Sequence, residues 1–312
     1  MRVFVAGASG VIGRQLLPVL VDAGHEVVGM TRSQSKQAAI GDAGARPIIA
    51  DALDPEGLTA ALLAAAPEVV VHELTAIPAA VDPRRFAADF APTNRLRREG
   101  TRNLVSAAIA AGTRRIVVES IAQAYAPVGG WVKTETDPLY SDAPEVFRDT
   151  FQAVIALEAA VAAAGELEGV VLRYGNFYGP GTAYAADGSI AELVRARRFP
   201  LAGEGCGRWS FAHVADAARA TLLAVQGGDV GVYNVVDDEP AAVSDWLPLY
   251  ARALGAPAPL EVGPPSSPYG RFGMLEARGA ANAKARSKLG WTPGYASWRE
   301  GFVAELAQAT RS

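Results

Sequence analysis

Residues 2–13 read RVFVAGASGVIG, an apolar strand that runs directly into a glycine-rich turn and then into a helix. A pyrophosphate needs backbone N–H groups that point at it and no Cβ atom in the way, and glycines permit that approach. The N-terminus of the following helix adds a partial positive charge. Because the pattern lies on the first strand and a second strand follows, it predicts a dinucleotide site in preference to a tight turn without a ligand.

The first half of the chain alternates short β-rich runs with longer helical stretches. The expected strands are RVFVA (2–6), EVVGM (26–30), RPIIA (46–50), EVVVH (68–72), RIVVE (115–119) and GVVLR (169–173). Their near-continuous apolar character is typical of parallel strands buried on both faces. Pro18 would normally disturb the interior of the first helix. The alternation predicts an α/β fold with a Rossmann-type doubly wound parallel sheet.

After residue 173 the pattern becomes irregular, with loops such as YGNFYGPGTAYAADGS and APAPLEVGPPSSPYG between short helical and strand-like pieces. We therefore expect residues 1–173 to form the dinucleotide-binding domain, completed by parts of 211–236. Residues 174–312 are expected to form a smaller, interleaved substrate-binding lobe.

The bulk properties narrow the class of protein. The chain has 312 residues, 50% of them hydrophobic, and a formal net charge of −4. The acidic balance argues against a nucleic-acid or anionic-membrane partner. No apolar run approaches the roughly 20 residues of a membrane span, and the N-terminal strand and turn do not fit a signal peptide. A single cysteine, Cys206, excludes an internal disulfide, so a cytoplasmic protein is expected.

The end of the second strand indicates which dinucleotide is bound. An NAD-selecting site usually places an acid there, but this chain has Arg32 and Ser33, with Lys36 close behind. The planar guanidinium suits a phosphate, and no carboxylate is present to repel one. The sequence therefore predicts NADP(H), with a solvated surface arginine as the alternative reading of Arg32.

Further cofactor contacts follow from the same geometry. Asp51, Ala52 and Leu53 follow the third strand, where an acid can hold the adenine amine and an apolar residue can pack on its face. A helix cap is the competing interpretation of Asp51. The residues expected to meet the pyrophosphate are Gly7, Ser9, Gly10, Val11 and Ile12.

Together these segments resemble the extended short-chain dehydrogenase/reductase superfamily, in its NAD-dependent epimerase/dehydratase-like branch. The resemblance covers nearly the whole chain. Besides GASGVIG, it rests on EGTRNLVSAA (99–108), LRYGNFYGPG (172–181), RWSFAHVADAARA (208–220), GVYNVVDDEP (231–240) and KARSKLGWTPGY (284–295).

The resemblance implies further site residues. The backbone after Arg173 should meet the nicotinamide, and Thr75 and Ala76 should flank its ribose. His72 and His213 are interpreted as structural. The nicotinamide-facing segment comprises Tyr174, Gly175, Asn176 and Phe177, with Asn176 also a candidate substrate contact.

The departures from the family are as informative as the matches. In the family, a Ser or Thr after the fifth strand and a Tyr-x-x-x-Lys on the next helix polarise the carbonyl and deliver the proton. Glu158, four residues beyond the lysine, and Tyr125, at the end of the post-strand segment, anchor the alignment. The lysine position is then Val154, the tyrosine position Thr150 and the hydroxyl position Ile121. The family's acid cannot be carried over to this sequence.

The sequence looks like an atypical branch of the superfamily, similar to ketoreductases that act on aromatic polyketides of the angucyclinone type in antibiotic biosynthesis. A positioned general acid contributes about 10²–10⁴ in rate, whereas near-attack geometry can contribute about 7 to 11 kcal/mol. Reduction of an activated ketone can therefore survive without the tyrosine. We expect NADPH-dependent reduction of a bulky aromatic ketone, with the proton from the substrate, from water or from another hydroxyl. The candidate substrate contacts are Ser120, Ile121, Tyr125, Thr150 and Asn176.

Two rival functions remain open. A non-catalytic NADP(H)-binding sensor or scaffold would keep the glycine turn and lose the chemistry. A nucleotide-sugar epimerase or reductase with relocated catalytic groups would need basic residues in the C-terminal lobe, and several arginines there could serve, although they also suit a solvated surface.

Three further expectations concern the surroundings of the site. The family's helical asparagine position holds Arg97, with Asn94 close by. Residues 75–92 are long enough to act as a lid, and the apolar helix at 150–164 would allow a homodimer. No metal site is expected.

Overall fold

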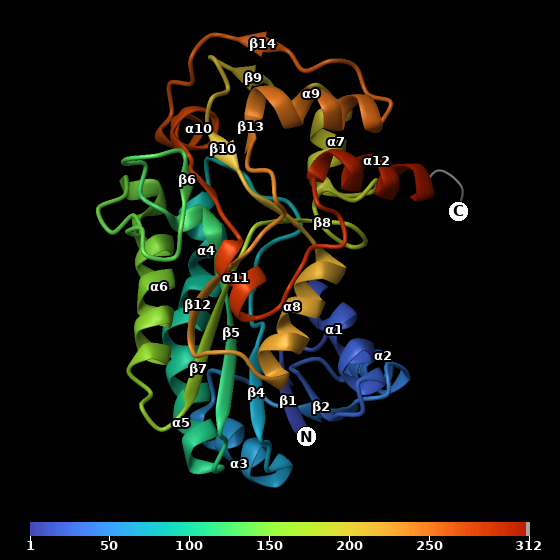
Figure 1. Cartoon of the computed structure of the whole chain (residues 1–312), viewed down its shortest axis with the longest axis vertical. Coiled ribbons are helices and arrows are strands. Elements are labelled where there is room, and N and C mark those ends of the chain that lie inside the picture. Colours follow the sequence, from blue (N-terminus) through green and yellow to red (C-terminus); the bar gives the residue numbers. More distant parts are fainter. Residues whose placement is uncertain (310–312) are drawn as a thin grey trace.

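A computed structural model describes residues 1–309 of the chain. Its centre is a seven-stranded parallel sheet with the strand order β12-β7-β5-β4-β1-β2-β3 (Figure 1). Its strands are β1 (Arg2–Ala6), β2 (Glu26–Thr31), β3 (Arg46–Ile49), β4 (Val69–His72), β5 (Arg115–Ile121), β7 (Glu168–Tyr174) and β12 (Gly231–Val235). The order reverses at β1, which pairs with β2 on one side and β4 on the other. In open α/β sheets, ligands bind at the carboxyl ends of the strands at this switch point.

Helices cover both faces of the sheet. One face packs against α1 (Val11–Asp22), α2 (Gln37–Asp42) and α8 (Val214–Gln226). The other face packs against α3 (Pro55–Ala65), α5 (Thr101–Ala110) and α6 (Glu145–Ala162). In Figure 1, the long helix α6 stands beside the sheet and α8 crosses its opposite side.

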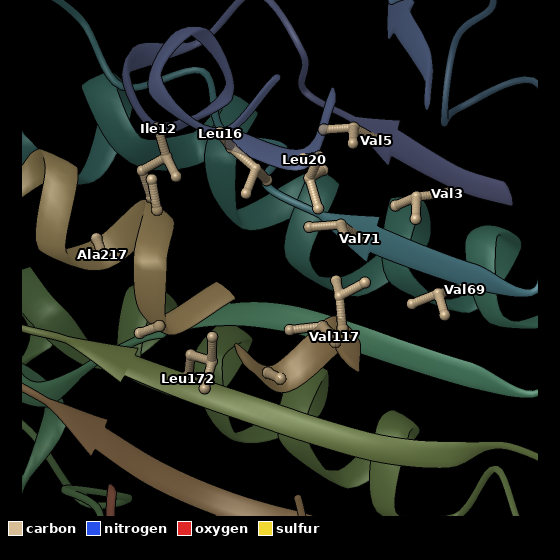
Figure 2. Packing of buried hydrophobic residues seen from close by; sticks show 14 of the residues in the cluster. Val3, Val5, Ile12, Leu16, Leu20, Val69, Val71, Val117, Leu172 and Ala217 are labelled. Atoms are coloured by element: carbon tan, nitrogen blue, oxygen red, sulfur yellow. The ribbon is translucent and has the colours of Figure 1, made fainter. Parts of the chain in front are cut away.

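Alternation along the strands divides the core between the two helical layers. Val3 and Val5 of β1 belong to the cluster that includes Leu16 and Leu20 of α1 (Figure 2). The intervening Phe4 joins the cluster on the opposite face. Both faces of the central strands therefore need apolar side chains, which is why these strands read as continuous apolar runs.

The C-terminal lobe has its own aromatic core beyond the carboxyl ends of the strands. Trp246, Phe211 and Phe302 are buried there, and their rings pack around Tyr184. The lobe is built from short pieces: β8 (Asn176–Tyr178), β9 (Leu201–Ala202), β10 (Arg208–Trp209), β11 (Phe211–His213), β13 (Ala241–Ala242), β14 (Glu261–Val262), α7 (Ser189–Arg195), α9 (Val243–Ala253), α10 (Pro268–Arg271) and α12 (Trp298–Ala309).

The remaining elements connect the sheet to this lobe. Helix α4 (Phe86–Arg95) continues through a π-helical turn at Leu96–Gly100 into α5. Helix α4 runs alongside α6. A second π-helical turn spans Phe272–Glu276. The other pieces are short 3₁₀ turns (Gln34–Lys36 and Ala122–Ala124), β6 (Val132–Lys133), β15 (Gly279–Ala280) and α11 (Ala283–Lys288).

The fold predicted from the sequence is confirmed: each of the six expected strands is present within one or two residues of its expected bounds. Pro18 lies within α1, and the helix continues through it. Its side chain is on the exposed side of α1, where water can satisfy the carbonyl that a proline cannot bond. The end of the 75–92 segment is helical, because α4 begins at Phe86. Within residues 1–309, no helix has the length and apolar character that crossing a membrane requires.

Candidate dinucleotide and substrate site

The glycine turn after β1 has no room for side chains. Gly7 has a φ of +98°, and a Cβ atom added there would lie 2.4 Å from the backbone oxygen of Glu73. A Cβ on Gly13 would lie 2.4 Å from the oxygen of Gly7. The helix that follows has Gly10 at its N-cap, no side-chain cap and no acid in its first turn. Its first N–H groups are therefore left for an anion, and this geometry fits a dinucleotide pyrophosphate.

A groove runs from this turn along the carboxyl edge of the sheet. Gly7, Ser9 and Gly10 of the turn line it, together with Thr75 from the segment after β4. The remaining lining residues are Met30, Thr31, Arg32, Ser33, Lys36, Glu73 and Leu74. Val11 is the first residue of α1, whereas the Ile12 side chain is buried in the core. Ile12 can therefore meet a ligand only through its backbone.

Basic and hydroxyl side chains gather at the β2 end of the groove. Arg32 is 58% exposed, and its Nη1 lies 3.8 Å from Oδ2 of Asp51. The Ser33 hydroxyl is 2.8 Å from that of Ser35, and the Ser33 N–H donates to Thr31. A neighbouring hollow is lined by Arg32, Ile49, Ala50, Asp51, Asp54 and Gly57.

Asp51 is not the cap of the following helix. Its Oδ1 accepts a hydrogen bond from the Leu53 N–H at 2.9 Å, within the turn after β3. The cap of α3 is Asp54, which accepts from Gly57 and precedes Pro55 at the first helical position. The other oxygen of Asp51, Oδ2, faces Arg32 at the neighbouring hollow. Ala52 is buried against the core on the α3 side of the sheet, with Leu53 packed against the same cluster.

Two of the candidate substrate contacts belong to a buried ion-pair network. The Ser120 hydroxyl donates to Oε1 of Glu158 at 2.7 Å. Arg173 donates to both oxygens of the same carboxylate, at 2.8 and 2.6 Å. The Tyr125 hydroxyl donates to Asn234 and accepts from Arg173. Both hydroxyls are engaged in joining β5 and α6 to β7 and β12.

The family's tyrosine and lysine positions lie in an apolar environment. Thr150 is buried, and its hydroxyl accepts a hydrogen bond from Asn94 at 3.1 Å. Val154, one turn further along α6, is buried in an apolar cluster, and Ile121 packs against that cluster. The positions that would carry the acid and its cation therefore hold no group that can donate a proton with assistance from a neighbouring positive charge.

Aromatic rings form a large part of this apolar cluster. Phe147 lies at its centre, with ring centroids 5.1 Å from Phe86, 5.4 Å from Phe151 and 5.0 Å from Phe272. Tyr140 and Tyr269 contact the same rings from the partly buried side of the cluster. Burial raises the pKa of both tyrosines, and the carboxylates of Glu276 and Asp142 raise the pKa of Tyr140 further. These phenols are thus weaker acids than free tyrosine.

The nicotinamide-facing segment expected after Arg173 lies at the carboxyl end of β7. The Tyr174 hydroxyl is buried and lies 2.7 Å from the Thr221 hydroxyl. A Cβ on Gly175 would lie 2.8 Å from the oxygen of Ser210, which also accepts from the Asn176 side chain. The ring of Phe177 packs on that of Tyr174. This segment is held close to the backbone of Ser210 and leaves little freedom for rearrangement.

The histidines have structural contacts. His72 is buried, its Nε2 is 2.9 Å from the Thr101 hydroxyl, and its Nδ1 accepts from the Leu74 N–H. His213 caps α8. At the end of β4, Thr75 lines the groove and the Ala76 N–H donates to Thr93.

Three charged residues near the groove are buried: Glu73, Arg97 and Glu119. Of these, only Arg97 was singled out from the sequence, at the family's asparagine position. A signal was present, because glutamates directly follow the apolar runs VVVH and RIVV. Burial raises the pKa of Glu119 to about 7. Burial, and the negative charge of Glu119, hold the pKa of Glu73 well above its ordinary value. Burial lowers the pKa of Arg97.

Similarity to known proteins agrees with this geometry. The model of the NAD dependent epimerase/dehydratase family matches residues 3–236. A 3-diazoavenalumate denitrifying reductase from a Streptomyces species is 48% identical over 311 residues, covering 98% of this chain and 100% of that protein. A 4-hydroxy-2-methyl-3-oxo-4-farnesyl-3,4-dihydroquinoline-1-oxide ketoreductase from Stigmatella aurantiaca is 29% identical, covering 84% of this chain and 75% of its own.

A solved structure, of MoeE5 in complex with UDP-glucuronic acid and NAD, is 28% identical, with a TM-score of 0.75 over 100% of this chain and 99% of its own. The glycine turn, the strand order and these matches lead to one assignment. The chain belongs to the NAD-dependent epimerase/dehydratase family, within the extended short-chain dehydrogenases/reductases.

Proposed function

We propose that this chain is an NADPH-dependent reductase that delivers hydride to an aromatic substrate without a proton donor from the protein. One observation carries the proposal: Val154 and Ile121, at the lysine and hydroxyl positions, are packed among aromatic rings. Thr150, at the tyrosine position, is buried and bonded to Asn94. A reaction that needed an acid from the protein would be slowed by about 10²–10⁴ at such a site. The substrate must therefore need no such acid.

An aromatic compound whose diazo group is a diazonium cation satisfies this condition best. The 48% identical Streptomyces relative is named for a diazo substrate and a denitrifying reduction. When a diazonium group is reduced in this way, a C–H bond replaces the C–N bond, and the electrons of the C–N bond leave with dinitrogen. The positive charge of the substrate passes to the oxidised cofactor. The reaction consumes one hydride and no proton. It therefore does not need the proton donor that the family's tyrosine and lysine would provide.

The residues of the chain then bind, orient and exclude water. A bound reduced nicotinamide dinucleotide supplies the hydride. The turn at Gly7 and Gly10 and the N-terminus of α1 hold its pyrophosphate. The aromatic cluster around Phe147 packs on the flat ring of the substrate and keeps water away from the reacting carbon.

The basic end of the groove supports a preference for NADP(H). Arg32, Ser33 and Lys36 line the groove together, and Arg32 is exposed enough to turn toward a phosphate. Asp51 competes for the same guanidinium from 3.8 Å. A 2′-phosphate would displace that weak pairing, because a phosphate carries more charge than one carboxylate.

Reduction of a ketone on a bulky aromatic, polyketide-like substrate is the second candidate. The Stigmatella relative, 29% identical, is named as a ketoreductase of a ring ketone. A ketone beside its own phenolic hydroxyl carries its proton donor with it. Water or one of the hydroxyls of Ser120, Tyr125 and Thr150 is the other source. Ser120 and Tyr125 would have to give up the hydrogen bonds that they donate, whereas Thr150 accepts its hydrogen bond from Asn94.

The proposal is tested by following NADPH oxidation against aromatic diazo compounds, hydroxylated aromatic ketones and nucleotide sugars. We expect oxidation with the diazo compounds, with one equivalent of dinitrogen released. Oxidation with the ketones alone would establish the second candidate. Turnover of nucleotide sugars, or tight binding of cofactor with no turnover of any compound, would overturn the proposal in favour of a sugar enzyme or a sensor.

A further inference from the structure

Glu73 lies in the wall of the groove, between the glycine turn and the segment that follows β7. Its N–H donates to the oxygen of Ala6 at 2.8 Å, and its Cβ would lie 3.2 Å from a Cβ atom added to Gly7. Gly7 and Glu73 both line the groove. The Oε1 atom of Glu73 lies 3.3 Å from the hydroxyl of Tyr174, the first residue of the nicotinamide-facing segment. A dinucleotide that extends from the turn to this segment therefore passes beside Glu73.

The carboxyl group of Glu73 is poorly placed to carry a negative charge. The residue is 6% exposed, and its Oε2 atom is buried and makes no hydrogen bond within residues 1–309. The Tyr174 hydroxyl lies closer to Thr221, at 2.7 Å, than to Oε1 of Glu73. A buried carboxylate needs hydrogen bonds and a cation, because an isolated charge is costly to remove from water. Without them, the neutral acid is the stable form of this group.

The groups that surround Glu73 add little to stabilise its charge. Burial and the negative charge of Glu119, which follows the paired residue of the neighbouring strand β5, raise the pKa of Glu73, whereas a hydrogen bond from Tyr174 lowers it. Arg97 acts on His72 and Glu119 instead. Burial lowers the pKa of His72 to about 4, so this imidazole carries no charge at physiological pH. A cation beside Glu73 would reverse the balance, because an opposite charge favours the ionised carboxyl.

The two forms of a nicotinamide cofactor differ in this respect, since the ring is neutral when reduced and carries a positive charge when oxidised. We propose that Glu73 responds to this difference: its carboxyl is neutral beside the reduced ring and ionised beside the oxidised ring, so the protein binds the oxidised cofactor more tightly as the pH rises. This inference rests on the proposed function, because it assumes that a nicotinamide dinucleotide fills the groove. In the ionisation, the O–H bond of Glu73 breaks and its proton passes to water, and no electrons are transferred.

The charge of Glu73 affects the reaction as well as binding. A positive charge develops on the ring as the hydride leaves, and a carboxylate beside it stabilises that charge more than it stabilises the neutral ring. Ionised Glu73 therefore favours transfer of the hydride to the substrate. This agrees with a reaction in which positive charge passes from a diazonium substrate to the cofactor.

Cofactor affinities measured as a function of pH test this inference without requiring catalysis. The dissociation constants of NADP⁺ and NADPH are determined between about pH 6 and about pH 9, the range in which a strongly buried carboxyl titrates. Their ratio is the informative quantity, because the 2′-phosphate, whose last proton leaves at about pH 6, is common to both ligands. The ratio of the NADP⁺ constant to the NADPH constant should fall about tenfold in the wild type, as expected when an opposite charge lowers the pKa of a carboxyl by about one unit.

Three glutamate-to-glutamine substitutions locate the titrating group. Glu73→Gln keeps the shape of the side chain without an ionisable proton, so its ratio should not depend on pH. Glu119→Gln removes the negative neighbour of Glu73, so the fall should keep its size and move to lower pH. Glu68→Gln, which changes an exposed glutamate at the other end of β4, is the matched control and should reproduce the wild-type profile. Wild-type affinity for NADPH at the lowest pH verifies that each variant is folded.

A ratio that is constant with pH in the wild type would overturn the inference. A pH-dependent ratio that survives in Glu73→Gln would also overturn it, because the titration would then belong to another group. If Glu73→Gln does not fold, Glu119→Gln decides, since an unchanged midpoint or a lost pH dependence in that variant would exclude Glu73 as the group. A wild type that binds neither cofactor would instead refute the dinucleotide assignment on which the inference rests.

Discussion

Glu158 of α6 and Arg173 of β7 form a buried, bidentate ion pair in which Nη2 of Arg173 lies 2.6 Å from Oε2 of Glu158. The side chains are only 11% and 5% exposed. Ser120 and Tyr125 bond to this pair, so the polar groups nearest the family's hydroxyl position are engaged in structure. This arrangement explains how the site can retain several hydroxyl groups and still lack an available acid.

Removing one partner of this pair should destabilise the protein strongly. Glu158→Gln leaves the Arg173 charge buried without compensation, which typically costs about 3–5 kcal/mol. Urea denaturation followed by circular dichroism measures the loss. The control is Glu99→Gln, whose exposed pair with Arg95 should contribute no more than about 1 kcal/mol. Equal effects from the two substitutions would contradict the structural role of the buried pair.

Gly7 should be intolerant of any side chain. Gly7→Ala places a methyl group 2.4 Å from the Glu73 oxygen at a positive φ. Gly24→Ala is a matched control, because Gly24 has a φ of +80° and nothing lies within 4 Å of the added atom. The control should cost about 1–2 kcal/mol from strain alone and leave dinucleotide binding intact. We expect Gly7→Ala to lose more stability and to weaken dinucleotide binding, and indistinguishable variants would show that the turn is not close-packed.

Arg32 should determine the preference between the two dinucleotides. Arg32→Ala removes a charge-assisted hydrogen bond to the 2′-phosphate, worth about 1.5–3 kcal/mol, or roughly ten- to more than a hundredfold in affinity for NADPH. The affinity for NADH, which lacks this phosphate, should not change. Titration of protein fluorescence with both cofactors provides the comparison. An unchanged NADPH affinity would refute the assignment.

Glu119 should make the protein less stable as the pH rises. Burial raises the pKa of this carboxyl to about 7 in the folded protein, above its ordinary 4.5. Its neutral form is therefore favoured by folding, and its stabilising contribution is complete below about pH 4.5 and lost as the pH rises through 7. Glu119→Gln carries no charge to desolvate, so the variant should gain stability relative to wild type between pH 5 and pH 8.

Melting temperatures of wild type and Glu119→Gln at these two pH values test this prediction. Asp237, whose pKa burial raises to about 8, is present in both proteins, so its effect cancels in the comparison. The substitution also removes the contribution of the Glu119 charge to the raised pKa of Glu73, so the measured difference includes that coupling. A constant difference between the two proteins across this range would mean that Glu119 does not titrate there.

The sheet could be predicted from the sequence because its signals are local. Val69, Val70 and Val71 of β4 are buried, and a strand that is covered on both faces needs apolar side chains at such positions. The glycine turn was predictable for the same reason. Position 7 has no room for a side chain, and the glycine in the sequence already indicates this.

The helix-cap interpretation of Asp51 was wrong. The cap of α3 is Asp54, which directly precedes Pro55, and proline favours the first helical position. That spacing was sufficient to identify the cap from the sequence.

The meeting of Glu73, Arg97 and Glu119 could not be predicted in this way. Glu73, Arg97 and Glu119 are distant in sequence, and only the pairing of β4 with β5 and the π-helical turn bring them together. The same holds for the aromatic cluster, where Phe86, Phe147 and Phe272 come from three separate segments. The local periodicity of a sequence does not indicate which distant segments come into contact in the fold.

Deuterium transfer from the cofactor to the product tests most directly whether the protein transfers hydride without supplying an acid. NADPH carrying deuterium at the reactive C4 position is incubated with an aromatic diazo substrate and either wild-type protein or Thr150→Val. We predict that the deuterium appears on the carbon that held the diazo group, with dinitrogen released and a similar kcat for both proteins. Product without deuterium, or a fall in kcat of about 10²–10⁴ for the variant, would contradict hydride transfer without an acid from the protein.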